Sequence, residues 1–390
     1  MPRAGPGPEV SSTFSNSSAG SGGLGGAIYT HSNIITTTTI TSSTFSNCSA
    51  YDGGAILAMR MYDTVPNTLT IISSTFSNCS AIGQGGAIRA WVDTVTITSS
   101  TFSSCSSSYI GGAITALTGS SLTVSTSTFS NCSAYLGNAI YADDRSVIDI
   151  HFSRISNDHG RAIFNSGGTV DAANNWWGTN NDPLGFTFGG VKVSPWLVLG
   201  ITATPSSITA GQTSVIRTNL TRNSAGTDTT SGGTFVPDDI TNTFTVSSGS
   251  SSVSPLTNGT TAGVAQTTFT PAGAGTSIIS ATVDNQTVFI TLTVTPAPTP
   301  VPTNSIIVPT YSQDQSDSTG DGGLPAIILP MIVTVNIGGN SGAGKSTVTG
   351  TKLSELIVTG TCSPAQALTS PHRRVLFTST SALSRPGSRQ

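Results

Sequence analysis

Polar and apolar residues alternate with a period of two in short stretches along the first half of the chain, as in Thr94-Val95-Thr96-Ile97-Thr98. Because successive side chains of a strand point to opposite faces, this alternation is typical of a half-buried β-strand. Each such stretch precedes a block that reads STFSNCSA or a close variant, and a second block, GGAI or a variant, follows it. The pattern predicts three short extended segments in every repeat.

The repeated blocks recur at a nearly constant spacing. Copies of the first block lie 31, 31, 26, 27 and 26 residues apart, counted at Phe14, Phe45, Phe76, Phe102, Phe129 and Ile155. The second block occupies residues 25–28, 53–56, 85–88, 111–114, 137–140 and 160–163. A period of this length indicates a solenoid or an array. Three short strands per repeat, separated by glycine, serine and asparagine, predict one rung of a right-handed parallel β-helix.

The alternation also predicts which side chains fill the interior. One inward column contains Ile40, Ile71, Ile97, Val124 and Ile150, and a second contains Thr38, Leu69, Val95, Leu122 and Ile148. Two outward columns contain Thr39, Thr70, Thr96, Thr123 and Asp149, and then Thr41, Ile72, Thr98, Ser125 and His151. One rung buries too little to fold alone, but five or six stacked rungs share a continuous core. The glycines of GGAI are expected at corners, where positive φ or a tight bend suits a residue without Cβ.

The two blocks together resemble the polymorphic outer membrane protein repeat, which pairs an F-x-x-N block with a GGA-[ILV] block. The resemblance covers about residues 11–165 and implies the pectin lyase-like solenoid of adhesin-like surface proteins. One position departs from the family pattern, because cysteine takes the asparagine slot at Cys48, Cys79, Cys105 and Cys132. The asparagines beside these cysteines are therefore not the ladder asparagines of the family.

The four cysteines are predicted to form a buried column of small, weakly polar thiols. A zinc site needs about four ligands that converge tetrahedrally, whereas thiols one rung apart lie in a line. Parallel side-chain directions on neighbouring rungs also suit a disulfide poorly. Cys362 has no partner in this scheme.

The solenoid closes with the stretch TVDAANNWWG at residues 169–178, which resembles the ANNWWG ending found after such β-helices in surface proteins. Trp176 and Trp177 are expected to cover the last rung, whose open edge would otherwise template aggregation.

Longer alternating strands follow, and they predict an antiparallel β-sandwich. This segment resembles the invasin-type bacterial immunoglobulin-like domain, which lacks paired cysteines and acts as a spacer or stalk. We therefore expect a disordered start at 1–10, a β-helix at 11–198, the sandwich at 199–295, a Pro/Ser/Thr-rich linker at 296–323, a small β segment at 324–361 and a disordered tail at 362–390.

Composition narrows the classes of function. Only 8% of residues are charged and the net charge is −3, so nucleic-acid binding, which needs a basic stripe, is not expected. The longest apolar run, residues 326–335, is too short to span a bilayer and contains Pro330. The start MPRAGPGPEV lacks the features of a signal peptide, although the repeats begin at once after it. We expect a fragment of an exported protein.

Residues 339–346, GNSGAGKS, match the phosphate-loop pattern GxxxxGK[ST]. A phosphate loop opens a helix, whereas the next residues are β-branched and interrupted by glycine. Glu355 is the only acidic residue after Lys345, which leaves no downstream carboxylate for a magnesium ion. Nucleotide binding is not expected.

Parallel β-helices also host polysaccharide enzymes, which gather carboxylates on one face. Five aspartates of the solenoid fall in variable loops, at Asp52, Asp63, Asp93, Asp143 and Asp144, and no acidic column or pair repeats at the spacing of the rungs. The histidines are dispersed, at His31, His151, His159 and His372. The outward threonines suggest ice binding, but only Thr39 with Thr41 and Thr96 with Thr98 form complete pairs. No catalytic, cofactor-binding or metal-binding residue is assigned.

The sequence therefore favours a non-catalytic microbial protein at the cell surface or in the extracellular space, either adhesin-like or an envelope structural element. The expected partners are glycans or proteins of a host or neighbouring cell, with no nucleic acid, no nucleotide and no transmembrane segment. The binding surface is expected on exposed strand faces or on loops such as residues 59–66. The alternative is a carbohydrate-active β-helix enzyme of the polysaccharide lyase or glycoside hydrolase type.

Overall fold

The computed structural model describes residues 11–20, 22–32, 35–60, 67–92, 94–156, 160–247 and 251–298, together with three short strands farther along the chain. Within these residues the regular structure consists of β-strands and two short 3-10 helices, η1 (Pro183–Phe186) and η2 (Thr230–Gly232). No helix in this part of the chain is long and apolar enough to cross a membrane. The chain divides into two compact units, the first ending at Pro296 and the second beginning at Ala297.

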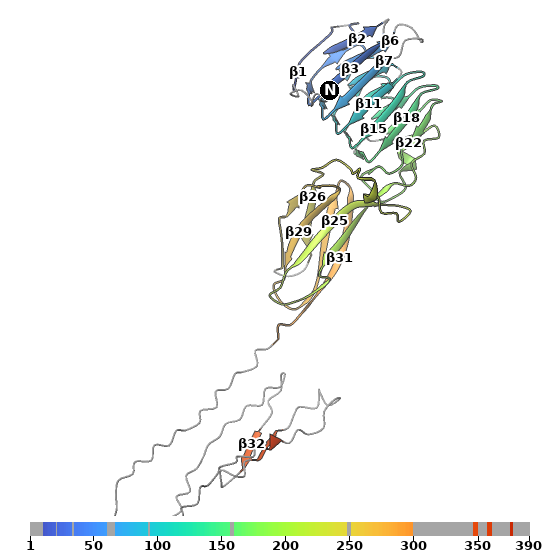
Figure 1. Cartoon of the computed structure of the whole chain (residues 1–390). Helices are drawn as coiled ribbons and strands as arrows, with labels where there is room; N and C mark the ends of the chain where they lie inside the picture. Colours follow the sequence, from blue (N-terminus) through green and yellow to red (C-terminus); the bar gives the residue numbers. More distant parts are fainter. Residues whose placement is uncertain are drawn as a thin grey trace, which may run out of the picture. The chain divides into compact units, whose positions relative to one another are not determined.

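The first unit begins with a parallel β-solenoid, coloured from blue to green in Figure 1, which confirms the predicted stack of rungs. Its first sheet contains β1 (Thr13–Ser15), β4 (Thr44–Ser46), β8 (Thr75–Ser77), β12 (Thr101–Ser103), β16 (Thr128–Ser130) and β19 (Arg154–Ser156). The second contains β2 (Ile28–Ser32), β6 (Ile56–Arg60), β10 (Ile88–Trp91), β14 (Ile114–Ala116), β17 (Ile140–Ala142), β20 (Ile163–Asn165) and β22 (Thr187–Phe188). The third contains β3 (Thr36–Thr41), β7 (Asn67–Ile72), β11 (Thr94–Thr98), β15 (Ser121–Ser125), β18 (Val147–His151) and β21 (Thr169–Asp171). Neighbouring strands are parallel throughout.

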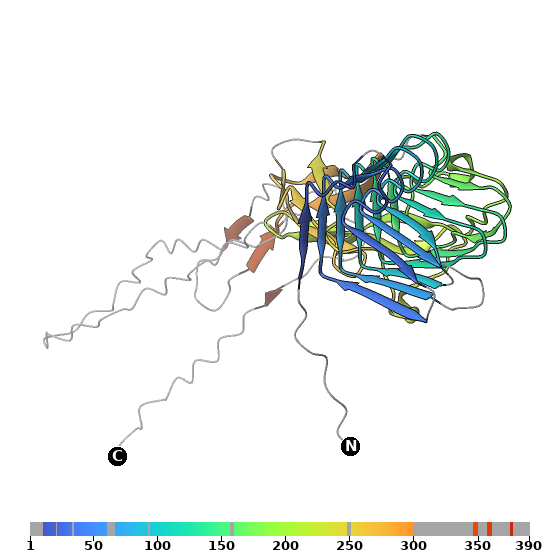
Figure 2. The ribbon, with the colours of Figure 1, turned by 90° about the horizontal axis from the view of Figure 1, so that it is seen from above.

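The register of the third sheet confirms the predicted columns. Ile97 lies opposite Ile71 on one side and Val124 on the other, and all three are 0% exposed. Thr96, the residue before Ile97, lies opposite Thr70 and Thr123 in the outward column and is half-buried. Figure 2 shows the strands of each wall stacked in chain order. A slip of one residue would turn the isoleucines to solvent, so the apolar column fixes the register.

Phenylalanine rings stack through the interior, one from each of the first five described turns, and Ile155 takes this position in the sixth. Neighbouring ring centroids between Phe14 and Phe129 are 4.7 to 5.0 Å apart, and the ring planes lie within 8° of parallel. This separation matches the distance of about 4.8 Å between hydrogen-bonded strands. Each fully buried phenylalanine contributes about 1.5 to 3 kcal/mol from the removal of apolar surface from water.

The corners of each turn depend on left-handed backbone. After the first-sheet strand, φ lies between 53° and 56° at Asn16, Asn47, Asn78, Ser104 and Asn131, a conformation that asparagine tolerates well. The residue before each cysteine, an asparagine in three copies and a serine before Cys105, is therefore a turn residue. In the GGAI block, the first glycine supplies positive φ, as at Gly85 (66°). The second permits close approach, since a Cβ on Gly86 would lie 2.0 Å from the carbonyl oxygen of Gly112 in the next turn.

A two-sheet sandwich follows the solenoid in the same unit. One sheet contains β23 (Leu197–Thr204), β25 (Ser214–Asn223), β29 (Val264–Thr270) and β27 (Ser252–Ser254). The other contains β24 (Ser207–Thr209), β31 (Gln286–Thr295), β30 (Gly275–Val283), β26 (Asn242–Val246) and β28 (Thr257–Asn258). The strands pair antiparallel except β24, which pairs in parallel with β31. Phe244, Phe269 and Leu292 form the centre of its core and are 0% exposed.

The second unit contains a small antiparallel sheet of β32 (Ser346–Thr349), β33 (Ile357–Gly360) and β34 (Val375–Leu376). Residues 339–345 of the phosphate-loop-like stretch lie outside the described residues, and the segment after them is a strand where a phosphate loop would open a helix. The predicted start at 1–10, the linker after residue 298 and the tail apart from β34 also lie outside the described residues.

Candidate functional site at the junction of solenoid and sandwich

A ladder of buried serines leads to the end of the solenoid. The backbone N–H of Ser74 donates to Oγ of Ser100 at 3.1 Å, and the Ser74 hydroxyl donates to the carbonyl oxygen of Ile72 at 2.9 Å. The same pair of bonds recurs at Ser43, Ser100 and Ser127. These bonds satisfy backbone groups at the bend between the third and first sheets.

Asn175 of the NNWWG stretch ends the serine ladder. Its Oδ1 accepts the backbone N–H of Ser153 at 2.9 Å, in place of the next serine. Its amide nitrogen donates to the carbonyl oxygens of Ile150 at 2.6 Å and Ala172 at 2.8 Å. One buried side chain therefore satisfies three backbone groups that another rung would otherwise serve.

The two adjacent tryptophans of the stretch belong to different cores. Trp177 is 3% exposed and packs within the solenoid core, whereas Trp176 is 0% exposed and packs in a second cluster with residues of the sandwich. That cluster also contains Leu197, Leu199, Leu220, Val236, Ile240 and Val283. The expected packing role holds for both rings, but Trp176 joins the two domains rather than only covering the last rung.

Asp284, in the turn between β30 and β31, connects the sandwich to the solenoid. Its side chain is 4% exposed. It accepts the indole N–H of Trp176 at 2.7 Å and the Nε–H of Arg154 at 3.1 Å, and a second guanidinium nitrogen of Arg154 also donates to it. A carboxylate is buried at this depth only when charge and hydrogen bonds compensate it, and these two residues supply both.

Further hydrogen bonds connect the same two domains. The backbone N–H of Asn180 donates to Oε1 of Gln286 at 2.8 Å, and its Oδ1 accepts the N–H of Leu199 at 2.6 Å. The side chain of Asn223 donates to Oδ1 of Asn174 at 3.0 Å. With an apolar cluster and a buried ion pair, this junction has the composition of a fixed interface and not of a hinge.

A cleft of about 610 Å³ lies beside the junction. Its solenoid wall consists of residues 98–101, Ser125 and Thr126, and its sandwich wall consists of residues 233–238, Thr261 and Ala262. Eight of the 14 lining residues are serine or threonine, and Asp238 is the only charged one among them. The lining is therefore rich in groups that both donate and accept hydrogen bonds.

The four cysteines of the solenoid are buried, as their column predicts. Each Sγ lies 3.6 to 3.7 Å from the carbonyl oxygen of the phenylalanine one turn earlier. Burial raises the pKa of the Cys48 thiol to about 11. Hydrogen bonds with Cys132 and Cys79, together with burial, raise the pKa of Cys105 well above its usual range. A hydrogen bond with Cys105 lowers the pKa of Cys79, so the pKa shifts along the column do not share one direction. Because a reactive thiolate must also be accessible, the burial of all four thiols favours a structural role.

The acidic residues noted in the sequence are distributed among separate contacts. Asp52 pairs with Arg89 at 3.7 Å, and Asp144 pairs with Arg145 at 3.4 Å. The remaining candidates are Asp143, which accepts a hydrogen bond from Thr118 at 2.7 Å, and Asp63 and Asp93, which lie outside the described residues.

The histidines are also separated. His31 stacks on Tyr29 with ring centroids 5.9 Å apart, and Nδ1 of His151 lies 2.8 Å from the carbonyl oxygen of Ala173. His159 and His372 lie outside the described residues. In the part of the chain that the structure describes, no group of three or more His, Cys, Asp or Glu side chains is placed to hold a metal ion.

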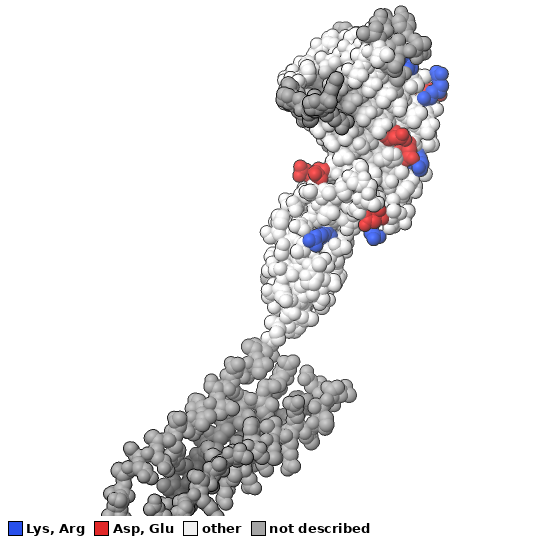
Figure 3. All heavy atoms as spheres, viewed as in Figure 1, with Lys and Arg blue, Asp and Glu red and all other residues white. Residues whose placement is uncertain are grey.

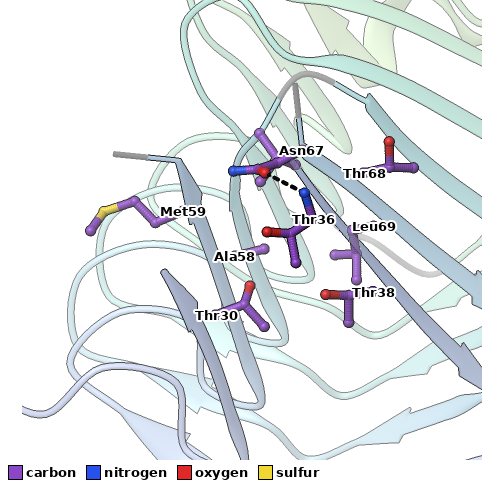
Figure 4. Close-up of a pocket in the computed structure, with 9 residues that line it drawn as sticks. Thr30, Thr36, Thr38, Ala58, Met59, Asn67, Thr68 and Leu69 are labelled. Carbon is purple, nitrogen blue, oxygen red and sulfur yellow. Dashed lines mark hydrogen bonds between the residues drawn. The ribbon is translucent and has the colours of Figure 1, made fainter. Parts of the chain in front are cut away.

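The loop expected to carry a binding surface, residues 59–66, is described only as far as Arg60. Beside it, Figure 4 shows a small cavity where the end of β6 meets β3 and β7. Its volume is about 10 Å³, and the backbone N–H of Thr36 donates to Oδ1 of Asn67 in its wall. A space of this size holds about one water molecule, so it is too small for an organic ligand.

Sequence reasoning missed two parts of the junction. The serine ladder had a signal, because the first serine of the STF block recurs in every copy. The sequence contains no signal for the role of Asp284, because this residue stands in an ordinary turn, VDNQ, and its partner Arg154 is 130 residues away.

No family model and no curated protein matches the chain. The D00–D0 domain of intimin is 16% identical over 27% of this chain and 51% of that chain, with a TM-score of 0.21. Domains 1–6 of the surface-layer protein SbsC are 21% identical over 31% of this chain and 16% of that chain, with a TM-score of 0.20. TM-scores of this size support no statement about the fold or the function of this chain.

Proposed function

We propose that this chain is a microbial surface or secreted protein that acts without catalysis, in adhesion or as an envelope structural element. In this proposal, a solenoid of polymorphic outer membrane protein type is held by an invasin-type immunoglobulin-like spacer. The observation that carries this proposal is the junction, in which the buried carboxylate of Asp284 in the sandwich binds Trp176 and Arg154 of the solenoid. A fixed connection suits a protein that presents a surface away from its anchor and resists force.

The chemistry of the described surface supports the same proposal. Figure 3 shows that most of the described surface in this view is uncharged. Several acidic residues of the first unit pair with one cation each, namely Asp52, Asp144, Asp171 and Asp284. A glycosidase instead needs two carboxyl groups within about 5 to 10 Å of each other across a substrate site. Asp149 and Asp171 do lie opposite each other on neighbouring strands, but Lys192 pairs with Asp171 and neither aspartate lines the cleft or the small cavity. This arrangement supports a scaffold over the carbohydrate-active enzyme.

The test compares binding with turnover. The labelled full chain is incubated with a panel of microbial and host cells, and binding is measured by flow cytometry. In parallel, soluble polysaccharides are incubated with the chain and assayed for reducing ends and for unsaturated products. We expect saturable binding to at least one cell surface, or assembly into an envelope layer, and no product. Enzymatic turnover of any polysaccharide would contradict the proposal.

A further inference from the structure

The cleft beside the junction has the size and position of a ligand site. Its volume of about 610 Å³ falls within the range of about 300 to 1,000 Å³ that is usual for small-ligand sites, and such sites often lie between domains. The walls come from two domains that the buried Asp284 and Trp176 hold together. When the walls of a cleft are already fixed, ligand binding does not require the loss of conformational entropy that ordering them would cost.

The solenoid wall presents hydroxyl groups from successive turns. Ser99 and Thr126 occupy the same corner of neighbouring turns, each with φ of 50°, and the N–H of Ser99 donates to the carbonyl oxygen of Ser125 at 3.1 Å. Thr101, in β12, lines the cleft beside this corner. Each hydroxyl both donates and accepts, which suits a partner that carries hydroxyl groups of its own.

The sandwich wall adds an aromatic ring and a carboxylate. Phe235 lines the cleft and is half-buried, so part of its surface faces open space. One carboxylate oxygen of Asp238 accepts the N–H of Ala262 at 2.8 Å, which fixes the side chain at the rim. An aromatic surface beside fixed polar groups matches the usual composition of sites that orient a ligand.

This lining discriminates among classes of ligand. An apolar molecule would bury the many hydroxyl groups without hydrogen bonds, which is unfavourable. An anionic molecule would meet Asp238 with no Lys, Arg or His among the lining residues to balance it. A neutral saccharide has hydroxyl groups for the Ser and Thr side chains and a C–H face that can pack on the ring of Phe235.

We propose that the cleft binds a neutral saccharide, with Phe235 against the sugar ring and with Thr101, Thr126 and Asp238 hydrogen-bonded to its hydroxyl groups. This inference rests on the proposed surface function and names the ligand class for it. A saccharide of a neighbouring cell or matrix would then be held between the solenoid and its spacer.

The test measures binding of the full chain to cello-, manno- and chito-oligosaccharides by isothermal titration calorimetry, with oligogalacturonates as the charged comparison. We expect at least one neutral oligosaccharide to bind in preference to the oligogalacturonates. Phe235→Ala should weaken this binding about tenfold or more, because it removes the aromatic contact. Thr101→Val keeps the shape of the side chain and should weaken binding about three- to tenfold, through the loss of one hydrogen bond.

Two matched variants control for general effects. Thr44 occupies the same column as Thr101, two turns away, so Thr44→Val should bind as the unmodified chain does. Tyr135 is an aromatic residue with 78% of its surface exposed and does not line the cleft, so Tyr135→Ala should also leave binding unchanged. Thermal unfolding of each variant shows whether it is folded.

Unchanged affinity in folded Phe235→Ala and Thr101→Val, preference for oligogalacturonates, or no saccharide binding would each overturn the inference. The cell-binding measurement shows whether such a result refutes only the saccharide site or also the proposed function. A chain that binds cells but no neutral saccharide refutes the ligand class alone, whereas turnover of a bound saccharide refutes the non-catalytic function.

Discussion

The indole N–H of Trp176 donates a 2.7 Å hydrogen bond to a carboxylate oxygen of Asp284, 108 residues farther along the chain. The same carboxylate pairs with Arg154 of the last first-sheet strand. Trp176 therefore spans the boundary between two domains, while the next residue, Trp177, packs in the solenoid core. The paired aromatic ending thus serves as a connector.

Replacing Asp284 with alanine should destabilise the first unit. The substitution leaves the guanidinium of Arg154 and the indole N–H of Trp176 without their acceptor in a mostly buried site. Breaking a buried ion pair in this way costs about 3 to 5 kcal/mol, and partial exposure of Arg154 (21%) should place this case toward the lower value. Denaturant unfolding measures the loss, and small-angle scattering should show a wider spread of domain orientations.

Asp144 provides the control for this experiment. It pairs with Arg145, but the two side chains are 65% and 76% exposed, so Asp144→Ala should change stability by less than about 1 kcal/mol. Equal effects of the two substitutions would contradict a specific role for the Asp284 pair.

The phenylalanine stack predicts a gradient of stability effects. Phe102 lies between two stacked rings and is 0% exposed, so Phe102→Ala should cost about 3 to 5 kcal/mol through lost contacts and a cavity. Phe14, in the first described turn, stacks on Phe45 and is half-buried, so Phe14→Ala should cost clearly less. Chemical denaturation of both variants checks the order, and the reverse order would argue against a continuous core.

Removing a single hydroxyl group from the serine ladder should lower the stability of the solenoid. Ser100→Ala removes the acceptor of the Ser74 backbone N–H inside the wall, which should cost about 1 to 3 kcal/mol. Ser103, three residues later, faces outward and is half-buried, so Ser103→Ala should stay within about 0.5 kcal/mol. Thermal unfolding measures the loss of stability in each variant. Equal losses in the two variants would contradict a stabilising hydrogen-bonded ladder.

The thiol of Cys48 predicts a loss of stability in alkaline solution. Burial raises its pKa from 9.0 to about 11, so the folded protein holds this proton more tightly than the unfolded chain. The stabilisation of the folded state that results from this raised pKa is therefore complete below about pH 9 and is lost as the pH rises through about 11. The difference in unfolding free energy between the unmodified chain and Cys48→Ala should become smaller as the pH rises from about 8 to about 11. A difference that is independent of pH would contradict a shifted thiol.

The solenoid was predictable because its information is local and repeated. A column such as Ile71, Ile97 and Val124 is visible in the sequence, since each copy presents the same alternation at the same distance from its phenylalanine. Stacking places equivalent residues side by side, so the register follows from the repeat. The buried thiols follow from the same alignment, whereas the left-handed turns at Asn47, Asn78 and Asn131 were seen only in the structure.

The cleft and the junction were not predictable in this way. Phe235 and Asp238 belong to a loop of the sandwich without a repeat or motif, and they meet Thr101 of the solenoid only in three dimensions. Nothing local distinguishes Asp284 from other turn aspartates of the sandwich, such as Asp239, which also has positive φ.

The sequence by itself determined the rungs, their register and the side chains that line their interior, because periodic burial requires a periodic pattern. Only the tertiary structure decided that Trp176 leaves the solenoid core, that Asn175 ends the serine ladder and that Asp284 accepts Arg154. The contacts of Asp284 with Trp176 and Arg154 join residues more than 100 positions apart in the chain, and their partners are selected by packing and by the need to compensate a buried charge. No pattern along the chain encodes that selection.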